Sequence, residues 1–198
     1  MPELLTELFS SRVRAAVLSQ LAPRPDTGMS LTELNRALGL PISSLQHECY
    51  KLERVGVLKS QREGNSRRYR LNPDFPALAP LVALVAAGMG QEAALRATLE
   101  PVSGLRAAFL GAALPLAANA GGASVPLVLI GEIPLEEVDA AQQRVAALLG
   151  LPADRVDTVF YLPADWNSRL AQGSAYALSL VAGPRVDLLG DPVAVAVG

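Results

Sequence analysis

Apolar positions recur at helical spacing along the first third of the chain. Between Leu4 and Leu21 they stand three or four residues apart, so we expect one amphipathic helix there, ended by the segment APRPDTG. A second helix is expected to begin at the cap Ser30, because the segment SLTE places this serine three residues before Glu33. Gly39 is expected to end it.

A third helix and a hairpin are predicted next. The segment GLPIS indicates a tight turn, and the helix after it runs from Ser43, which also serves as its cap, to about Val55. Its residues Leu45, Cys49 and Leu52 are spaced to face the core. The segments VLKSQR and RRYRL surround EGNS, which predicts two short strands joined by a turn. NPDFPALAPLVALVAAG predicts a further helix.

The pattern changes after Gly90, where strands and helices alternate. Short or amphipathic helices are expected in QEAALRATLE, PLEEVDAAQQRVAALLG and ADWNSRLAQGSAYALSLVAG, the last with a break at Gly173. Strands are expected in LRAAFLGA, SVPLVLIG, DRVDTVFYLP and PRVDLLGD. The predicted class is therefore mixed α+β, with one domain over residues 1–89 and a small α/β domain over residues 90–198.

Composition narrows the class of protein. With 198 residues, of which 51% are hydrophobic, the chain has ample apolar material for buried cores, which excludes general disorder. The single cysteine excludes an internal disulfide framework and favours the reducing cytoplasm. The N-terminal segment lacks the order of charges typical of a signal peptide. An uncharged stretch lies between Arg106 and Glu132, but its prolines and Gly-Gly pair favour two buried strands and a loop over a membrane span.

Charge is distributed unevenly. Residues 1–72 contain eleven Lys and Arg against seven Asp and Glu, a net charge of +4, whereas the remainder contains six Arg against twelve Asp and Glu, a net charge of −6. The basic first third indicates a polyanionic partner for the first domain only.

The order helix, helix, tight turn, helix, basic hairpin, helix over residues 5–88 resembles bacterial transcription regulators of the ArsR/MarR-like type. The resemblance lies in LTELNRALGLPISSLQHECYKLERVGVLKSQREGNSRRYRLNP, which has the small-residue turn, the Ser-led recognition helix and the arginine-rich wing of that family. It implies a winged helix-turn-helix domain that binds double-stranded DNA as a homodimer. We expect the first helix and the PALAPLVALVAAGMG helix to make the dimer contacts.

Candidate DNA-reading residues lie early in the third predicted helix, since a recognition helix enters the major groove by its N-terminal end. Their side chains donate or accept hydrogen bonds or carry charge: Ser43, Ser44, Gln46, His47 and Lys51. Gln46 is the strongest candidate for base readout because its amide can pair with adenine through two hydrogen bonds. An ordinary solvated face is the alternative. Cys49 cannot share a helix face with His47, so a metal site is not expected there.

Phosphate contacts are expected from the hairpin, through Arg62, Arg67 and Arg68 beside the EGNS tip. Alternation along the strand places Arg68 and Arg70 on one side and Arg67 and Leu71 on the other, so the arginines cannot all contact the DNA backbone at once. We expect loss of Arg67 or Arg68 to weaken binding to all sequences similarly. A solvated hairpin that merely resists aggregation is the alternative.

Residues 92–192 resemble small nucleotidyltransferase domains, which carry a Gly-Ser after one strand and an Asp-x-Asp on the next to hold Mg²⁺ and nucleotide phosphates. The frame is visible in FLGA, SVPLVLIG and RVDTVFY, but its chemistry is absent. The serine position falls on Ala112 and the carboxylates fall near Ser124 and Pro126, which leaves only Asp157. One carboxylate cannot cluster the oxygen anions that Mg²⁺ needs. The loop PLAANAGGA also lacks a basic residue.

The sequence therefore predicts a cytoplasmic, sequence-specific DNA-binding transcription regulator, with no catalytic residues, no cofactor and no metal. Its degenerate second domain is expected to serve dimerisation or to bind a protein partner or small-molecule effector. The alternative is a nucleotidyltransferase whose winged helix controls its own expression, and a winged helix that binds protein is a third possibility. The absent carboxylates favour the first reading over the second, and the basic balance argues against the third.

Overall fold

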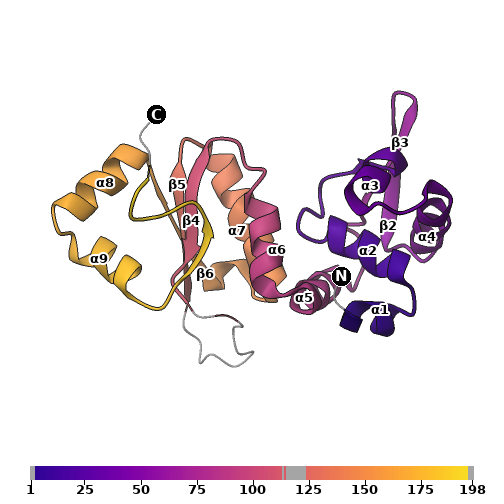
Figure 1. The fold of residues 1–198 in the computed structure, drawn as a ribbon, viewed down its shortest axis with the longest axis horizontal. Coiled ribbons are helices and arrows are strands. Elements are labelled where there is room, and N and C mark those ends of the chain that lie inside the picture. Colours follow the sequence, from indigo (N-terminus) through magenta and orange to yellow (C-terminus); the bar gives the residue numbers. More distant parts are fainter. Residues whose placement is uncertain (1–2, 113, 115–123, 196–198) are drawn as a thin grey trace. The chain divides into compact units, whose positions relative to one another are not determined.

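The computed structural model describes residues 3–112, 114 and 124–195 of a mixed α+β chain (Figure 1). In this described part there are nine α-helices, one short 3-10 helix and two sheets. The chain divides into two compact units, Met1–Gly90 and Gln91–Gly198. Each unit has its own sheet, and each is described by itself.

The first unit surrounds a three-stranded antiparallel sheet with the order β1-β3-β2. Its elements, in chain order, are α1 (Glu3–Phe9), α2 (Arg12–Leu21), β1 (Met29–Ser30), α3 (Leu31–Leu38), α4 (Ile42–Arg54), β2 (Leu58–Glu63), β3 (Ser66–Leu71) and α5 (Leu78–Met89).

The single helix predicted between Leu4 and Leu21 is wrong, because the chain breaks into α1 and α2. Ser10 adopts a left-handed backbone with φ 51°, which ends α1. The Ser11 hydroxyl then accepts a hydrogen bond from the backbone N–H of Arg14 at 3.2 Å and caps α2. The apolar spacing continues across the break, so periodicity alone does not reveal it.

The predicted start of α3 is confirmed. Ser30 Oγ accepts from the backbone N–H of Glu33 at 3.3 Å, and Glu33 Oε2 accepts from the backbone N–H of Ser30 at 2.7 Å, which completes a capping box. The hydrogen bond from the Ser30 backbone lowers the pKa of Glu33, with smaller contributions from the Ser30 hydroxyl and Arg68. Gly39 ends the helix with φ 65°.

Helix α4 buries the face that the sequence predicts: Leu45 and Cys49 are fully buried and Leu52 is 5% exposed. Its predicted cap is wrong, however. The N-cap position is Pro41, with no side-chain cap, so Ser43 lies inside the first turn. Proline fixes a φ compatible with the approach to a helix, and the helix therefore begins before the serine pair.

Burial raises the pKa of the Cys49 thiol to about 12, with further contributions from Glu53 and Glu48. The unfolded thiol loses its proton near its ordinary value of 9.0 while the folded thiol keeps it, so this residue's contribution to stability falls as the pH rises through 9. At pH 10 we expect the wild type to have lost about 1.4 kcal/mol more unfolding free energy than Cys49→Ala, each relative to pH 8. Denaturant titrations at both pH values measure this difference, and equal losses would contradict it.

The hairpin is confirmed as well. Strands β2 and β3 pair from Leu58 with Leu71 to Glu63 with Ser66, and the turn is Gly64–Asn65. Gly64 has φ 57°, which a two-residue turn of this kind requires. Tyr69 and Leu71 point to the core, at 4% and 1% exposure.

The second unit has a four-stranded sheet with the order β6-β5-β4-β7, in which only β5 and β6 are parallel. The predicted strands and helices after Gly90 are confirmed. They are α6 (Gln91–Leu99), β4 (Leu105–Leu110), β5 (Val125–Gly131), α7 (Leu135–Leu149), β6 (Val156–Tyr161), α8 (Pro163–Ala171), α9 (Ala175–Ala182) and β7 (Val186–Leu189), with the 3-10 helix Ala153–Arg155 before β6.

Helices cover both faces of this sheet, with α6 and α7 on one side and α8 and α9 on the other (Figure 1). The core under α8 and α9 is built around Trp166, which is fully buried with Phe109 and Ile130. Trp166 Nε1 donates a hydrogen bond to the backbone oxygen of Pro192 at 2.6 Å, so its polar atom is satisfied.

Within the described ranges, no single helix is both long enough and apolar enough to cross a membrane; α5 and α6 reach that length and apolarity only together, as a broken pair.

Candidate nucleic-acid interface

Helix α4 presents one polar, solvent-exposed face. Ser43, Gln46 and His47 are exposed on it, as predicted candidates, and Tyr50 continues the same face with 60% of its area exposed. Ser44 and Lys51 are partly buried and lie at the flank of this face. The sequence pattern did not single out Tyr50, although it stands three residues after His47 and four after Gln46, a spacing that places all three side chains on one helix face.

A buried carboxylate fixes the opposite side of α4 to α2. Glu48, 7% exposed, pairs with Arg14 at 3.0 Å and with Lys51 at 3.1 Å. Burial raises the pKa of Glu48, but the hydrogen bonds donated by Lys51 and Arg14 outweigh burial, and the pKa is lowered overall. Lys51 therefore forms an ion pair with this buried carboxylate and is also a candidate DNA contact.

Arg67 joins the hairpin to α4. Its guanidinium donates to both carboxylate oxygens of Glu53 at 2.8 Å and to Ser60 Oγ at 2.8 Å. It also lies over the ring of Tyr69, 5.5 Å from the ring centre. These contacts hold β3 against the helix whose outer face carries Gln46.

Arg68 is committed to a second set of internal contacts. It donates to the backbone oxygen of Gly28 at 2.6 and 3.1 Å and pairs with Glu33 at 3.2 Å and with Glu63 at 3.1 Å. The arginine thus connects the hairpin to α3 and to the segment before β1. No periodicity predicts these pairs, because the partners stand up to 40 residues apart in the sequence.

Arg62 is the predicted phosphate contact that remains uncommitted. Its side chain is exposed on β2, opposite Arg67, and makes no hydrogen bond or ion pair with the described part of the chain. The exposed Arg36 of α3 and Arg54 of α4 are likewise unpaired with any residue that the structure describes. The positive charge of the hairpin is therefore partly compensated by carboxylates, whereas Arg62 is an exposed cation with no carboxylate partner among the described residues.

In the second unit, the positions that the nucleotidyltransferase resemblance singled out come together at one end of the sheet. The backbone N–H of Gly111, next to Ala112, donates to Pro126 O at 2.8 Å, and Pro126 is the register partner of Asp157. Ser124 is exposed just before β5. The PLAANAGGA loop lies outside the described residues.

This end of the sheet carries Asp157 near Tyr176 of α9. Burial raises the pKa of Tyr176, with contributions from Asp157 and Tyr161. Among residues 3–112, 114 and 124–195, no three His, Cys, Asp or Glu side chains gather as they would around a metal ion. Asp157 and Tyr176 therefore lie near one another here without the cluster of carboxylates that a bound Mg²⁺ needs.

No protein-family model, curated protein or solved structure matches this chain.

Proposed function

We propose that the protein is a sequence-specific, double-stranded DNA-binding transcription regulator whose first unit acts as a winged helix-turn-helix domain. The observation that carries the proposal is the exposed polar face of α4, with Ser43, Gln46, His47 and Tyr50, beside a basic two-stranded hairpin. A helix fits the major groove of B-DNA, where polar side chains can distinguish all four base pairs.

In this proposal α4 reads bases and the hairpin contacts phosphates. Gln46 pairs with adenine, while Ser43, Ser44 and His47 contact neighbouring base edges or phosphates, with Lys51 at the flank. Arg62 supplies the hairpin's phosphate contact. Arg67 and Arg68 act as positioning residues, because their guanidinium groups hold the hairpin to α4 and α3.

The proposal includes a homodimer that binds a two-fold symmetric site. Leu4 and Leu8 of α1 and Leu84 of α5 are exposed by 64%, 53% and 45%, and apolar side chains of this size are favoured at contacts between copies. Two copies double the number of base contacts, and their half-sites are expected about one helical turn apart or a small multiple of it.

The second unit is proposed to serve dimerisation or the binding of a partner or ligand, without catalysis. Ala112, Ser124 and Pro126 have no carboxylate to offer a metal beside Asp157. A nucleotidyltransferase remains the second candidate, since Asp157 lies at the expected end of the sheet. Magnesium-dependent transfer from a ribonucleoside triphosphate, lost in Asp157→Ala, would establish the enzyme instead.

Genome-wide recovery of DNA bound to the full chain tests the proposed function. We expect a small set of sites that share one sequence with two-fold symmetry, which purified protein then binds in vitro. Recovery of no shared sequence, or of fragments bound only in proportion to their length, would contradict sequence-specific regulation.

Arg62→Ala is expected to weaken binding to all DNA sequences to a similar extent. Each lost phosphate contact releases one fewer condensed counterion, so the slope of log affinity against log salt should flatten by about one unit per protomer. Arg67→Ala is the matched comparison. Because Arg67 is paired with Glu53, its loss should change the slope less. Affinities measured between about 50 and 200 mM salt decide the point, and an unchanged slope in Arg62→Ala would remove Arg62 from the interface.

A further inference from the structure

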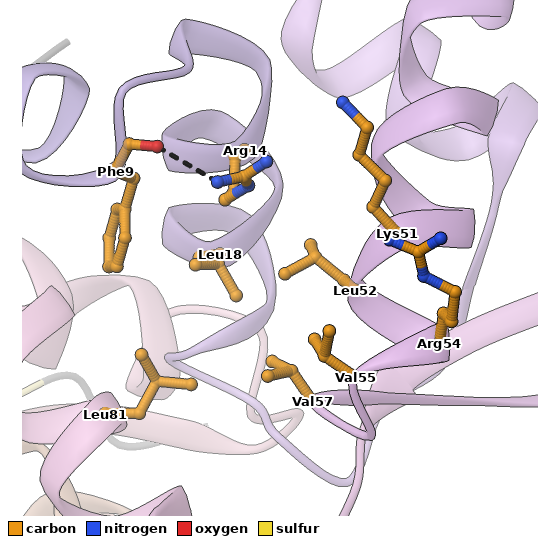
Figure 2. Close-up of a pocket in the computed structure, with 9 residues that line it drawn as sticks. All are labelled: Phe9, Arg14, Leu18, Lys51, Leu52, Arg54, Val55, Val57 and Leu81. Atoms are coloured by element: carbon orange, nitrogen blue, oxygen red, sulfur yellow. Dashed lines mark hydrogen bonds between the residues drawn. The ribbon is translucent and has the colours of Figure 1, made fainter.

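A cavity of about 470 Å³ lies in the first unit between α2, α4 and α5 (Figure 2). Its walls are apolar, and include Leu18 of α2, Leu52 of α4 and Leu81 of α5. Leu18 and Leu52 are only 2% and 5% exposed, so these walls are recessed below the surface. Cavities that hold small molecules have volumes of roughly 300 to 1,000 Å³.

Three cations stand around this apolar space. Figure 2 shows Arg14 on the α2 side, with Lys51 and Arg54 on the α4 side. Arg14 and Lys51 share the single carboxylate of Glu48. Arg54 is exposed and has no hydrogen bond or ion pair within the described chain. Three positive charges therefore stand beside one carboxylate, which leaves an excess of two positive charges. A bound anion would reduce this excess.

We propose that this cavity binds a small amphipathic anion, with an aliphatic or aromatic body and one carboxylate group. The body fills the space beside Leu18, Leu52 and Leu81, and the carboxylate lies toward Arg54 and Lys51. A cationic ligand would meet like charge at this opening. A recessed apolar space favours a small molecule over the flat surface of another protein.

Ligand binding is expected to affect the face of α4 that we propose to read DNA, and this part of the inference rests on the proposed function. The cavity borders Lys51 and Leu52 in the second half of α4, and the Arg14–Glu48–Lys51 contacts hold that helix to α2. A bound carboxylate competes with Glu48 for Lys51, which weakens one of the contacts that hold Glu48 in place beside Arg14. The position of α4 relative to α2 then depends on occupancy, which gives the ligand differential affinity for two arrangements.

Titration calorimetry of the full chain with sodium decanoate tests the binding itself. We expect one site per chain, and affinity for decylammonium, which has the same alkyl chain and the opposite charge, at least about tenfold weaker. Arg54→Gln should weaken decanoate binding about fivefold. The matched control Arg36→Gln removes an exposed arginine of α3 that lies away from the cavity, and should leave the affinity unchanged.

Val55→Trp provides a second variant, because Val55 lines the cavity. Since Val55 is 61% exposed, the larger side chain should narrow the opening without overpacking the core. Decanoate affinity should fall at least about tenfold, with an unchanged circular dichroism spectrum. Equal affinity of the wild type and both cavity variants would overturn the proposal. Weaker self-association of Val55→Trp in sedimentation, with decanoate affinity unchanged, would instead assign this face to a second copy of the chain.

The effect on DNA is measured separately, with a recovered binding sequence and saturating decanoate. We expect at least about a threefold change in DNA affinity in the wild type and a smaller change in Val55→Trp at the same decanoate concentration. Decanoate binding at the cavity with no sequence-specific DNA binding would contradict the proposed function alone. Specific DNA binding without decanoate binding would contradict only the ligand site, and binding of both without mutual influence would contradict the coupling.

Discussion

Replacing Trp166 by alanine is expected to lower the unfolding free energy of the second unit by about 3 to 5 kcal/mol. Trp166 is fully buried, with its ring centre 6.0 Å from that of Phe109 and 5.1 Å from that of Tyr161. Truncation removes this packing, leaves a cavity under α8 and α9, and deprives the Pro192 carbonyl of its donor. Denaturant unfolding followed by far-ultraviolet circular dichroism measures the loss.

Trp166→Phe is the matched control for this prediction. Phenylalanine keeps most of the aromatic packing but cannot donate to Pro192, so the expected loss is about 1 to 2 kcal/mol. A loss below about 1 kcal/mol in the alanine variant would show that this core tolerates the cavity. Cys49 labelling during the same titration reports the unfolding of the first unit. That transition should be unchanged, because Cys49 belongs to the first compact unit and Trp166 belongs to the second.

Gln46→Ala is expected to have the largest effect on DNA recognition. A two-hydrogen-bond contact between glutamine and adenine contributes about 1 to 3 kcal/mol of discrimination, and a symmetric dimer makes it twice. Affinity for the recovered binding sequence should therefore fall by about 2 to 6 kcal/mol, whereas affinity for unrelated DNA stays nearly constant, because phosphate contacts are unaltered. Gln46 is exposed, so its truncation removes no buried packing and should leave the fold unchanged.

Gln143→Ala is the control, because it makes the same change at an exposed position of α7 in the second unit. Its affinity for both kinds of DNA should equal that of the wild type. Equal losses on specific and unrelated DNA in Gln46→Ala would assign Gln46 to the phosphate backbone. No loss on either would remove this position from the interface.

Local patterns predicted much of the first unit. The capping box at Ser30 and the turn at Gly64 depend on residues a few positions apart, and the buried face of α4 follows from helical periodicity. The break at Ser10 was missed because apolar spacing continues through it. The start of α4 was misplaced because Pro41, not Ser43, precedes its first turn.

Contacts between distant residues were not predictable in this way. Arg67 and Glu53 are 14 residues apart, and Arg68 and Gly28 are 40 apart, so only the folded backbone brings them together. The sequence shows that the hairpin is rich in arginine, but it does not show which of these arginines are paired with carboxylates. In the second unit, alternating apolar segments predicted the strands, whereas the order β6-β5-β4-β7 depends on pairing across the whole domain.

The attachment of α4 has a consequence for protein engineering. Glu48 and Glu53 fasten this helix to Arg14 and Arg67, and neither carboxylate belongs to its exposed face. A designer who wants a new sequence preference should therefore vary the exposed residues and keep both glutamates. A library built on those rules should yield a higher fraction of folded variants than one that exchanges the whole helix, because the fastening points and the variable positions are different residues.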